Sequence, residues 1–352
     1  MRIVVTGATG NIGSAVLRAL DGRGHAVHGI ARRPLPASRS VTWSRLDLSD
    51  DGCVPELQSV VAGADAVVNL AWAFQPMRRR DYLHRASVGI LERVARATLA
   101  NSDARLVHLS SVAVYSPRAS TALVDEEWPR DGIPGATYSR LKVQAERALH
   151  VVAASARARD RVSVVRPSLV GQRAAGGMML RCGAPAAFPA GALRRVPVSP
   201  VDDRFGIQMV HADDVADVVV RILEREAAGA FNVAAEPVLS GHDIAAALCA
   251  RPVRLRQEVV SAAAAAVWLA HLSPLDPGWV DMALQAPWVD SSRARDVLGW
   301  SCEHDAHEVL AELVEGMRQG AGAGGCALRP RHVADGLLTA GRRGSVARRR
   351  LT

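Results

Sequence analysis

The segment TGATGNIG, residues 6–13, constrains the fold of this chain more than any other feature. It directly follows a β-branched run at residues 2–5 and leads into residues 12–20, where apolar side chains recur at helical spacing. A strand, turn and helix in this order need glycines for the tight turn, for the approach of a phosphate to the backbone, and for close helix packing. The first N–H groups of the helix favour a bound anion. The segment therefore predicts a dinucleotide site with contacts at Thr6, Gly7, Thr9, Gly10, Asn11, Ile12 and Gly13.

Four later apolar runs repeat the strand pattern, at residues 26–30, 66–70, 105–109 and 162–165. Helical or loop segments separate each run from the next. Alternation of this kind predicts a parallel sheet with helices on both faces. We therefore expect an α/β fold with a doubly wound parallel sheet of the Rossmann type.

The order of elements loosens beyond residue 170. Residues 171–200 are rich in glycine, alanine and proline, which predicts an irregular cover for a substrate. A strand at 207–211 and a helix at 213–224 are expected to rejoin the sheet, and further helices are expected at 240–249 and 261–271. The expected domains are a dinucleotide-binding domain at 1–170, with 207–235 returning to it, and a smaller interleaved C-terminal substrate-binding lobe at 171–206 and 236–320.

Composition is that of a globular protein, with 49% hydrophobic and 22% charged residues in 352. The first residues run into a strand without the regions of a signal peptide, so we expect a cytoplasmic protein. The longest apolar run, 262–270, is far shorter than the roughly 20 residues that cross a bilayer, and no membrane association is expected. The five cysteines lack the spacing of a zinc site or a disulfide framework, so no metal is expected.

The net charge of +8 resides mostly in the last part of the sequence. Residues 321–352 contain seven arginines and one aspartate, which accounts for +6. This stretch is rich in glycine and arginine and predicts a disordered basic tail. The two interpretations of the tail are a solvated segment without function and weak adhesion to anions or nucleic acid. A specific nucleic-acid partner is not expected, because the rest of the chain is nearly balanced in charge.

The end of the second strand bears on the choice between NAD and NADP. A carboxylate there binds the ribose 2′-hydroxyl of NAD, whereas an arginine accommodates the 2′-phosphate of NADP. The sequence has Ala31 followed by Arg32 and Arg33, which favours NADP, although both arginines are also interpretable as solvated surface residues. Asp47, beside Leu48, is a candidate partner for the adenine amino group or, equally, a helix cap.

Tyr138 and Lys142 lie in TYSRLKVQAERAL, a segment of helical period, so their separation of four places both side chains on one helix face. A nearby ammonium and a nicotinamide cation favour the phenolate of a tyrosine, which can then exchange a proton with a substrate hydroxyl. Lys142 is the only lysine of the chain, and the other 42 basic positions are arginines. The planar guanidinium is a poor replacement for a compact ammonium that touches ribose hydroxyls.

A third element is HLSSVAVYS, where a strand ends at Ser110 and Ser111. The carboxyl ends of parallel strands line the ligand cleft, so a hydroxyl there can hold the substrate oxygen together with Tyr138. We predict Ser111 in this role, while a simple strand-ending turn is the alternative. Tyr115 is a candidate for shaping the same cleft or for packing.

Together these motifs resemble the extended short-chain dehydrogenase/reductase family, which includes nucleotide-sugar epimerases and dehydratases. The resemblance covers residues 1–300 and includes NLA at 69–71, YSRLK at 138–142, RPSLVG at 166–171 and VDSSRARDVLGW at 289–300. It implies an NAD(P) cofactor, a catalytic set of Ser111, Tyr138 and Lys142, and a candidate homodimer face on the helices flanking the tyrosine. Further cofactor contacts are expected at Leu48, Leu70, Ala71, Tyr138, Lys142, Arg166 and Pro167.

Three functions fit the sequence. The leading interpretation is hydride transfer at a secondary alcohol or ketone of a small molecule, with epimerisation or dehydration of a sugar nucleotide implied by the resemblance alone. The first alternative is an NADPH-dependent ketone reductase for a small apolar substrate, favoured by Arg32, Arg33 and the apolar lobe. The second is a non-catalytic NAD(P)-binding sensor, against which the complete serine, tyrosine and lysine set argues.

Overall fold

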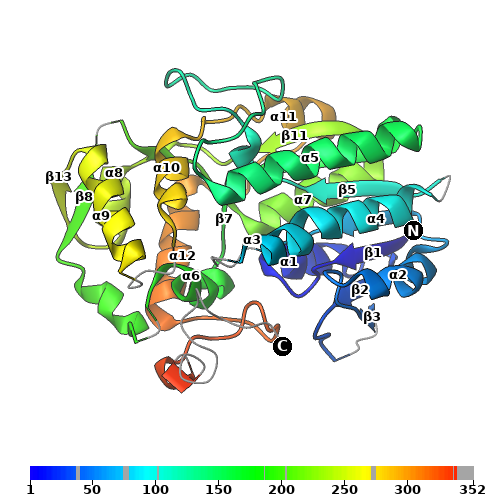
Figure 1. Cartoon of the computed structure of the whole chain (residues 1–352), viewed down its shortest axis with the longest axis horizontal. Helices are drawn as coiled ribbons and strands as arrows, with labels where there is room; N and C mark the ends of the chain where they lie inside the picture. Colours follow the sequence, from blue (N-terminus) through cyan, green and yellow to red (C-terminus); the bar gives the residue numbers. More distant parts are fainter. Residues whose placement is uncertain are drawn as a thin grey trace.

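The computed structural model describes residues 1–36, 40–73, 79–100, 103–185, 187–202, 204–270, 275–335 and 337–338. Its centre is a seven-stranded sheet in the order β3-β2-β1-β4-β5-β6-β11 (Figure 1), and every neighbouring pair is parallel. Successive strands are added on one side of β1 up to β3 and on its other side from β4 onward. Doubly wound sheets bind ligands at such a change in strand order, here between β1 and β4. The predicted Rossmann-type fold is confirmed. The strands are β1 (Arg2–Thr6), β2 (Ala26–Ala31), β3 (Val41–Arg45), β4 (Ala66–Asn69), β5 (Arg105–Leu109), β6 (Val162–Pro167) and β11 (Gly229–Val233).

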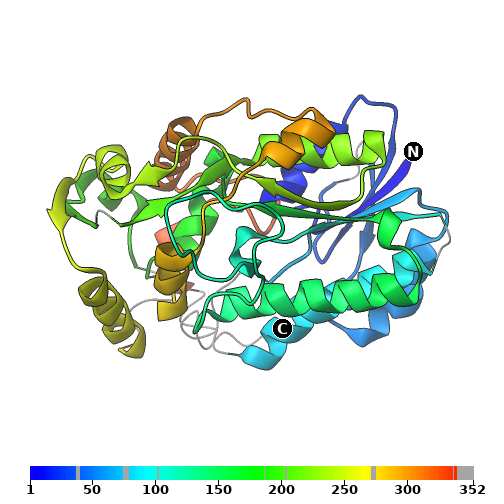
Figure 2. The same cartoon turned by 90° about the horizontal axis from the view of Figure 1, so that it is seen from above.

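Helices cover both faces of this sheet and bury two separate apolar clusters (Figure 2). The strand runs are buried on both sides because each face packs against helices with an apolar stripe. One face carries α1 (Asn11–Leu20), α7 (Ala212–Arg225) and α11 (Ser292–Leu298). The other carries α2 (Val54–Val61), α3 (Arg80–His84), the π-helical turn η2 (Arg85–Gly89), α4 (Ile90–Leu99) and α5 (Thr137–Ser155).

The remaining elements form a smaller part beside the sheet, on the left in Figure 1. Three two-stranded sheets join β7 (Leu169–Gly171) to β10 (Met209–His211), β9 (Gly206–Ile207) to β12 (Leu239–Ser240), and β8 (Val198–Val201) to β13 (Arg251–Arg254). The helices are α6 (Gly176–Gly183), α8 (Gly241–Ala247), α9 (Gln257–Leu269), α10 (Pro277–Gln285) and α12 (Ala306–Gln319). In the part of the chain that the structure describes, every helix is too short or too polar to cross a membrane.

The expected return of residues 207–211 to the central sheet is wrong. This stretch is divided between β9 and β10, and β10 pairs with β7 outside the central sheet. The strand that does return is β11, which pairs with β6 at the sheet edge. The helix of this region returns as expected, because α7 packs against α1.

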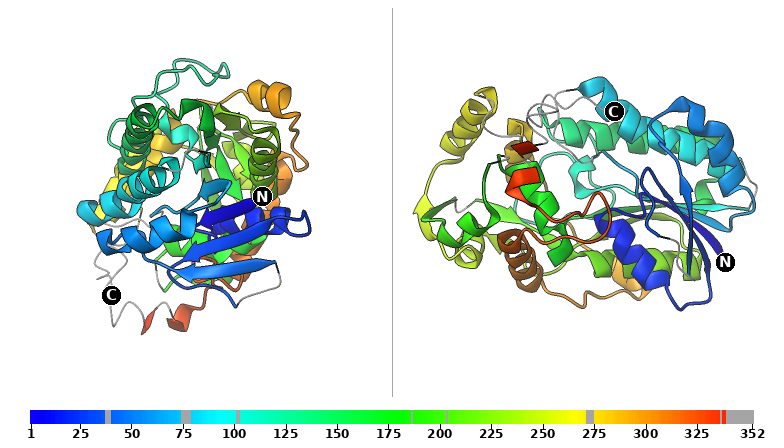
Figure 3. Two further views of the ribbon diagram at one scale, coloured as in Figure 1. Left: turned by 90° about the vertical axis from the view of Figure 1, so that its right-hand side faces the viewer. Right: turned by 90° about the horizontal axis from the view of Figure 1, so that it is seen from below.

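Residues 321–335 differ from the disordered tail that composition indicates. Leu328 is 1% exposed and belongs to the apolar cluster of α12. The side chain of Arg181 in α6 donates to the carbonyls of Ala327 and Arg329. Figure 3 shows this orange-red segment reaching helix α1. Residues 339–352, the rest of the predicted tail, lie outside the described residues.

Candidate active site

The glycine-rich turn between β1 and α1 leaves no room for side chains. Gly7 has a φ of +66°, and a Cβ on it would lie 2.8 Å from the backbone nitrogen of Ala71. A Cβ on Gly13 would lie 2.3 Å from the carbonyl oxygen of Gly7, and one on Gly10 would lie 3.1 Å from it. No side chain caps the first turn of α1. Bare backbone and an uncapped helix start fit a dinucleotide phosphate.

The other predicted cofactor residues follow the carboxyl ends of neighbouring strands. Arg32 and Arg33 are exposed just beyond β2, and the guanidinium of Arg32 donates to the phenol of Tyr82 over 3.2 Å. Thr6 is fully buried, and its hydroxyl donates to Asn69 Oδ1 over 2.6 Å, which ties β1 to β4. Along this edge, in chain order, lie Thr6, Gly7, Thr9, Gly10, Asn11, Ile12, Gly13, Ala31, Arg32, Arg33, Asp47, Leu48, Leu70, Ala71 and Pro167.

Two of the predicted cofactor contacts have hydrogen-bond partners in the protein: one is buried, the other exposed. Arg166 is 1% exposed, and its guanidinium makes two hydrogen bonds of 3.0 and 2.8 Å to the carboxylate of Glu146 and one to Tyr115. These partners hold the guanidinium inside the protein, and its contact with the cofactor stays a prediction. Asp47 accepts hydrogen bonds from the backbone and hydroxyl of Ser49, which form a local turn, whereas the following 3₁₀ helix is capped by Asp50.

Ser111, Tyr138 and Lys142 are brought together at the carboxyl end of β5. Ser111 starts the 3₁₀ turn η3 (Val112–Val114), and its side chain hydrogen-bonds with Tyr138, which lies in the first turn of α5. Lys142 lies one turn further along, where its ammonium donates to the carbonyl of Leu109 over 2.9 Å. The ammonium is 5.8 Å from the centre of the Tyr138 ring.

Burial dominates the electrostatics of this group. Burial raises the pKa of Tyr138 to about 12, and the hydrogen bond with Ser111 opposes this shift. Burial also lowers the pKa of Lys142 to about 7, against the attraction of Glu146 one turn away. His108, beneath the lysine, has a pKa well below its ordinary value because of burial and of the charge on Lys142. The phenol is therefore neutral and able to donate a proton at neutral pH.

Two tryptophans that sequence reasoning missed flank Tyr138. The ring of Trp279, in α10, lies 5.0 Å from the tyrosine ring at 33°. The ring of Trp72, just after β4, lies 6.1 Å away at 77° and covers the ammonium of Lys142 at 3.7 Å. Trp72 directly follows the NLA motif at a strand end, so its position was a usable signal. Trp279 carried none, because it comes from a distant helix.

Backbone contacts hold in place the two segments that carry these tryptophans. A Cβ on Gly278 would lie 2.7 Å from Cα of Ala136, so only glycine lets the start of α10 touch the start of α5. Asp276 caps α10 by accepting from the backbone of Gly278 over 2.9 Å. The loop of Trp72 is held by a hydrogen bond from Ala73 N to the carbonyl of Ala86 in η2. Both indoles are half-buried.

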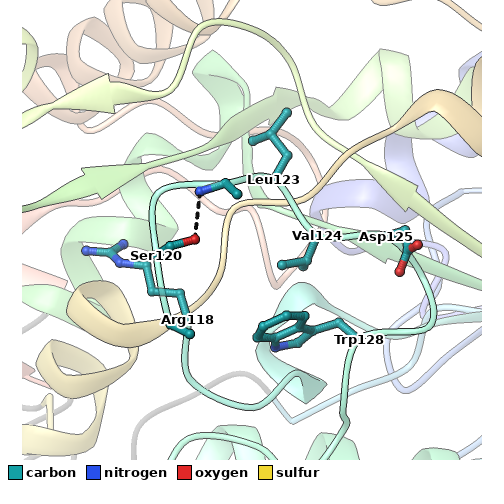
Figure 4. Close-up of a pocket in the computed structure, with 8 residues that line it drawn as sticks. Arg118, Ser120, Leu123, Val124, Asp125 and Trp128 are labelled. Atoms are coloured by element: carbon teal, nitrogen blue, oxygen red, sulfur yellow. Dashed lines mark hydrogen bonds between the residues drawn. The ribbon is translucent and has the colours of Figure 1, made fainter.

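A separate cavity of about 200 Å³ lies in the loop between η3 and α5 (Figure 4). It contains none of the predicted site residues. Its lining consists of Arg118, Ala119, Ser120, Ala122, Leu123, Val124, Asp125 and Trp128.

The sheet order, the bare glycine turn and the polar groups at the strand ends define a dinucleotide-binding protein of the doubly wound α/β class. Comparison with known proteins gives its family. The model of the NAD-dependent epimerase/dehydratase family matches residues 3–234, and the chain belongs to this family.

Individual relatives are more distant. An uncharacterised protein of Mycobacterium tuberculosis is 27% identical over 329 residues, which is 92% of this chain, so that the chain spans 31% of that relative's length. A 4-hydroxy-2-methyl-3-oxo-4-farnesyl-3,4-dihydroquinoline-1-oxide ketoreductase of Stigmatella aurantiaca is 32% identical over 148 residues, 42% of this chain and 44% of the relative.

Among solved structures, the UDP-glucuronic acid 4-epimerase of Bacillus cereus in complex with UDP-glucuronic acid and NAD is similar to this chain with a TM-score of 0.67. The two share 18% sequence identity, over 91% of this chain and 99% of that one. At this identity the likeness concerns the fold alone.

Proposed function

We propose that this chain is an NAD(P)-dependent oxidoreductase that acts at a secondary alcohol or ketone of a small molecule, with Tyr138 as the acid and base. The observation that carries the proposal is the hydrogen-bonded pair of Ser111 and Tyr138 with Lys142 one helical turn away, on the sheet edge that also holds the glycine turn. A sensor needs a cofactor site but no proton relay, so this cluster favours an enzyme.

Each residue has a separate task in the proposed reaction. When bound, the nicotinamide supplies or accepts the hydride. The hydroxyl of Ser111 holds the substrate oxygen, and the Oη of Tyr138 gives that oxygen its proton during reduction or removes it during oxidation. The ammonium of Lys142 stabilises the phenolate and binds ribose hydroxyls.

Ketone reduction is the direction that the site favours. The pKa of Tyr138, raised by burial to about 12, keeps the phenol protonated, which suits donation to a developing alkoxide. The similarity to a ketoreductase agrees with this direction. Epimerisation or dehydration, in which the cofactor is regenerated, is the second candidate, favoured by the family. Steady consumption of NADPH with a carbonyl substrate separates the two, because an epimerase consumes none.

We extend the proposal to the cofactor preference, the domain roles and the cellular location. The exposed Arg32 and Arg33 favour NADP over NAD. Residues 1–170, together with α7 and β11, form the dinucleotide-binding domain, the lobe at 171–211 and 236–320 binds the substrate, and α5 is a candidate homodimer face. The protein works in the cytoplasm without a nucleic-acid partner.

The test is Tyr138→Phe, which keeps the ring and removes the proton. Removing a general acid lowers kcat by about 10²–10⁴-fold, and we expect the dinucleotide Kd to change less than about threefold. Turnover is followed as NADPH oxidation with a panel of ketones, and Kd by fluorescence titration.

The matched control is Tyr115→Phe, because Tyr115 is fully buried and its phenol bonds to Asn232 away from the glycine turn. This variant should lose stability and keep its turnover per folded molecule. Turnover of Tyr138→Phe equal to that of the unaltered protein rejects the assignment.

A further inference from the structure

Tyr138, the proposed proton donor, contacts two aromatic side chains, although aromatic residues are rare in this chain. Only three tyrosines, seven tryptophans and four phenylalanines occur in 352 residues. Two of the seven tryptophans nevertheless meet the same tyrosine, from a strand end and from a lobe helix. The contact of Gly278 with Ala136 that brings Trp279 to Tyr138 tolerates no side chain. The aromatic cluster is thus built by close backbone packing of two separate parts of the fold.

Trp72 also carries an unsatisfied polar group. Its indole Nε1 is buried and has no hydrogen-bond partner in the described part of the chain. An indole N–H only donates, and a buried donor without an acceptor destabilises the fold. An oxygen acceptor on a ligand beside Tyr138 would satisfy it. The cluster therefore offers ring faces together with one donor in addition to the phenol.

Three arginines of the lobe are bound to protein groups. Arg194 pairs with Glu315 at 3.0 Å and Arg204 with Asp202 at 3.2 Å. The guanidinium of Arg181 donates to the carbonyl of Ala327 over 2.6 Å. A nucleotide-diphosphate substrate would need such side chains for its negative charge. Because of these contacts, the three arginines are less available to the diphosphate of a sugar nucleotide.

We propose that Trp72 and Trp279 form an aromatic slot at Tyr138 that selects flat aromatic ketones, or the corresponding alcohols, over aliphatic ketones and sugar nucleotides. This inference rests on the proposed function. The aromatic ring packs against the indoles, and the carbonyl oxygen faces the phenol of Tyr138 and the hydroxyl of Ser111. In reduction, one hydride adds to the carbonyl carbon from NAD(P)H and the tyrosine proton adds to the oxygen. NAD(P)⁺ and the alcohol then leave, and the phenolate takes a proton from the solvent.

The experiment compares acetophenone with cyclohexyl methyl ketone, which has the same carbonyl beside a saturated ring. UDP-glucose serves as the sugar nucleotide and is assayed with NAD(P)⁺, because its hydroxyls can only be oxidised. We expect kcat/KM to be about tenfold higher for acetophenone, since aromatic pairing adds to simple area burial. Trp279→Leu should abolish this preference mainly through KM for acetophenone. Trp279→Phe should retain it within about threefold.

Trp288→Phe is the control for loss of an indole elsewhere, because Trp288 bonds to Gly206 and packs under Arg118. It should leave the preference unchanged. The inference is overturned if both ketones react equally well, if Trp279→Leu slows both equally, or if UDP-glucose is the better substrate. In these cases the proposed function stands, provided that turnover still depends on Tyr138.

If no carbonyl compound is reduced, the proposed function fails. The slot is then tested by the binding of the two ketones alone. Quenching of tryptophan fluorescence by acetophenone and by cyclohexyl methyl ketone then gives the two Kd values. Tighter binding of acetophenone that is lost in Trp279→Leu and kept in Trp279→Phe supports the slot. Equal binding in all variants overturns it.

Discussion

At the scale of single residues, burial pushes the two titrating groups of the site in opposite directions. It raises the pKa of Tyr138 to about 12 and lowers that of Lys142 to about 7. Both shifts favour the uncharged form, as desolvation always does. A neutral phenol can donate a proton at once but must lose one before it can accept another. The two directions of the reaction should therefore depend differently on pH.

The oxidation of an alcohol should accelerate as the pH rises. Below the pKa of Tyr138 the fraction of phenolate grows tenfold per pH unit, so we expect kcat/KM for oxidation to rise with a slope near one between about pH 6 and 8. Reduction, which uses the protonated phenol, should decline over that range only as far as the ammonium of Lys142, whose pKa is about 7, loses its charge. Initial rates with an alcohol and its ketone measure both profiles. A flat profile for oxidation would show that proton removal by a phenolate is not limiting.

Lys142 should reduce the stability of the fold at low pH. Its pKa is about 7 in the folded chain and 10.5 as the ordinary value, so the unfolded chain binds this proton more tightly. The destabilisation is complete below pH 7 and fades as the pH rises toward 10.5. Lys142→Met should thus raise the free energy of unfolding by about 1–3 kcal/mol at pH 6 and much less at pH 10. Urea unfolding at both pH values tests this, and an equal change at both contradicts it.

At the scale of elements, local patterns predicted those strands whose burial is visible in sequence. The run 105–109 coincides with β5, and 26–30 and 66–70 lie within one residue of β2 and β4. Residues 207–211 have an equally apolar pattern, but the partner of a strand is decided by hydrogen bonds far along the chain. Val210 pairs with Val170 rather than with the central sheet, and no local pattern reports this.

The site residues likewise fall into those that local spacing predicts and those that depend on contacts between distant parts of the chain. Tyr138 and Lys142 share a helix, so their spacing alone placed them on one face. Trp279 reaches Tyr138 through the docking of α10 on α5, which depends on Gly278, and no local pattern in the sequence reports this contact. A motif assigned Arg166 to the cofactor, but it gave no sign of the ion pair that Arg166 makes with Glu146 on α5.

Residues 321–335, after α12, are ordered by one buried apolar residue although their composition indicates disorder. Glycine and arginine indicate disorder, yet Leu328 is buried in the cluster of Ala175 and Leu313. We expect Leu328→Ala to lower the free energy of unfolding by about 2–4 kcal/mol, because the cavity left behind adds to the lost burial. Leu338→Ala is the matched control, since Leu338 is 61% exposed, and should have almost no effect. Equal and small effects of both changes in chemical denaturation would contradict the docking of this segment.

At the scale of the whole molecule, the same segment connects the lobe to the dinucleotide end of the sheet. A Cβ on Gly325 would lie 2.6 Å from the carbonyl oxygen of Thr9, and Arg33 Nη1 donates to Cys326 Sγ over 3.0 Å. The chain beyond α12 thus touches both the glycine turn and one of the two arginines that favour NADP. Cofactor binding at this place should therefore raise the free energy of unfolding of the entire fold.

Thermal unfolding in the presence of each dinucleotide measures this coupling and the cofactor preference together. A ligand that binds only the folded chain stabilises it by RT ln(1 + [L]/Kd), so a tenfold lower Kd adds about 1.4 kcal/mol, or roughly 1–3 °C in Tm for a chain of this size. We expect NADP to raise Tm more than NAD at equal concentration. The double variant Arg32→Ser, Arg33→Ser should respond equally to both, because it lacks the cations that meet the 2′-phosphate. Arg23→Ser, which removes an exposed arginine paired with Glu224, should keep the difference. A larger rise with NAD than with NADP in the unaltered chain would mean that neither arginine meets the ribose phosphate.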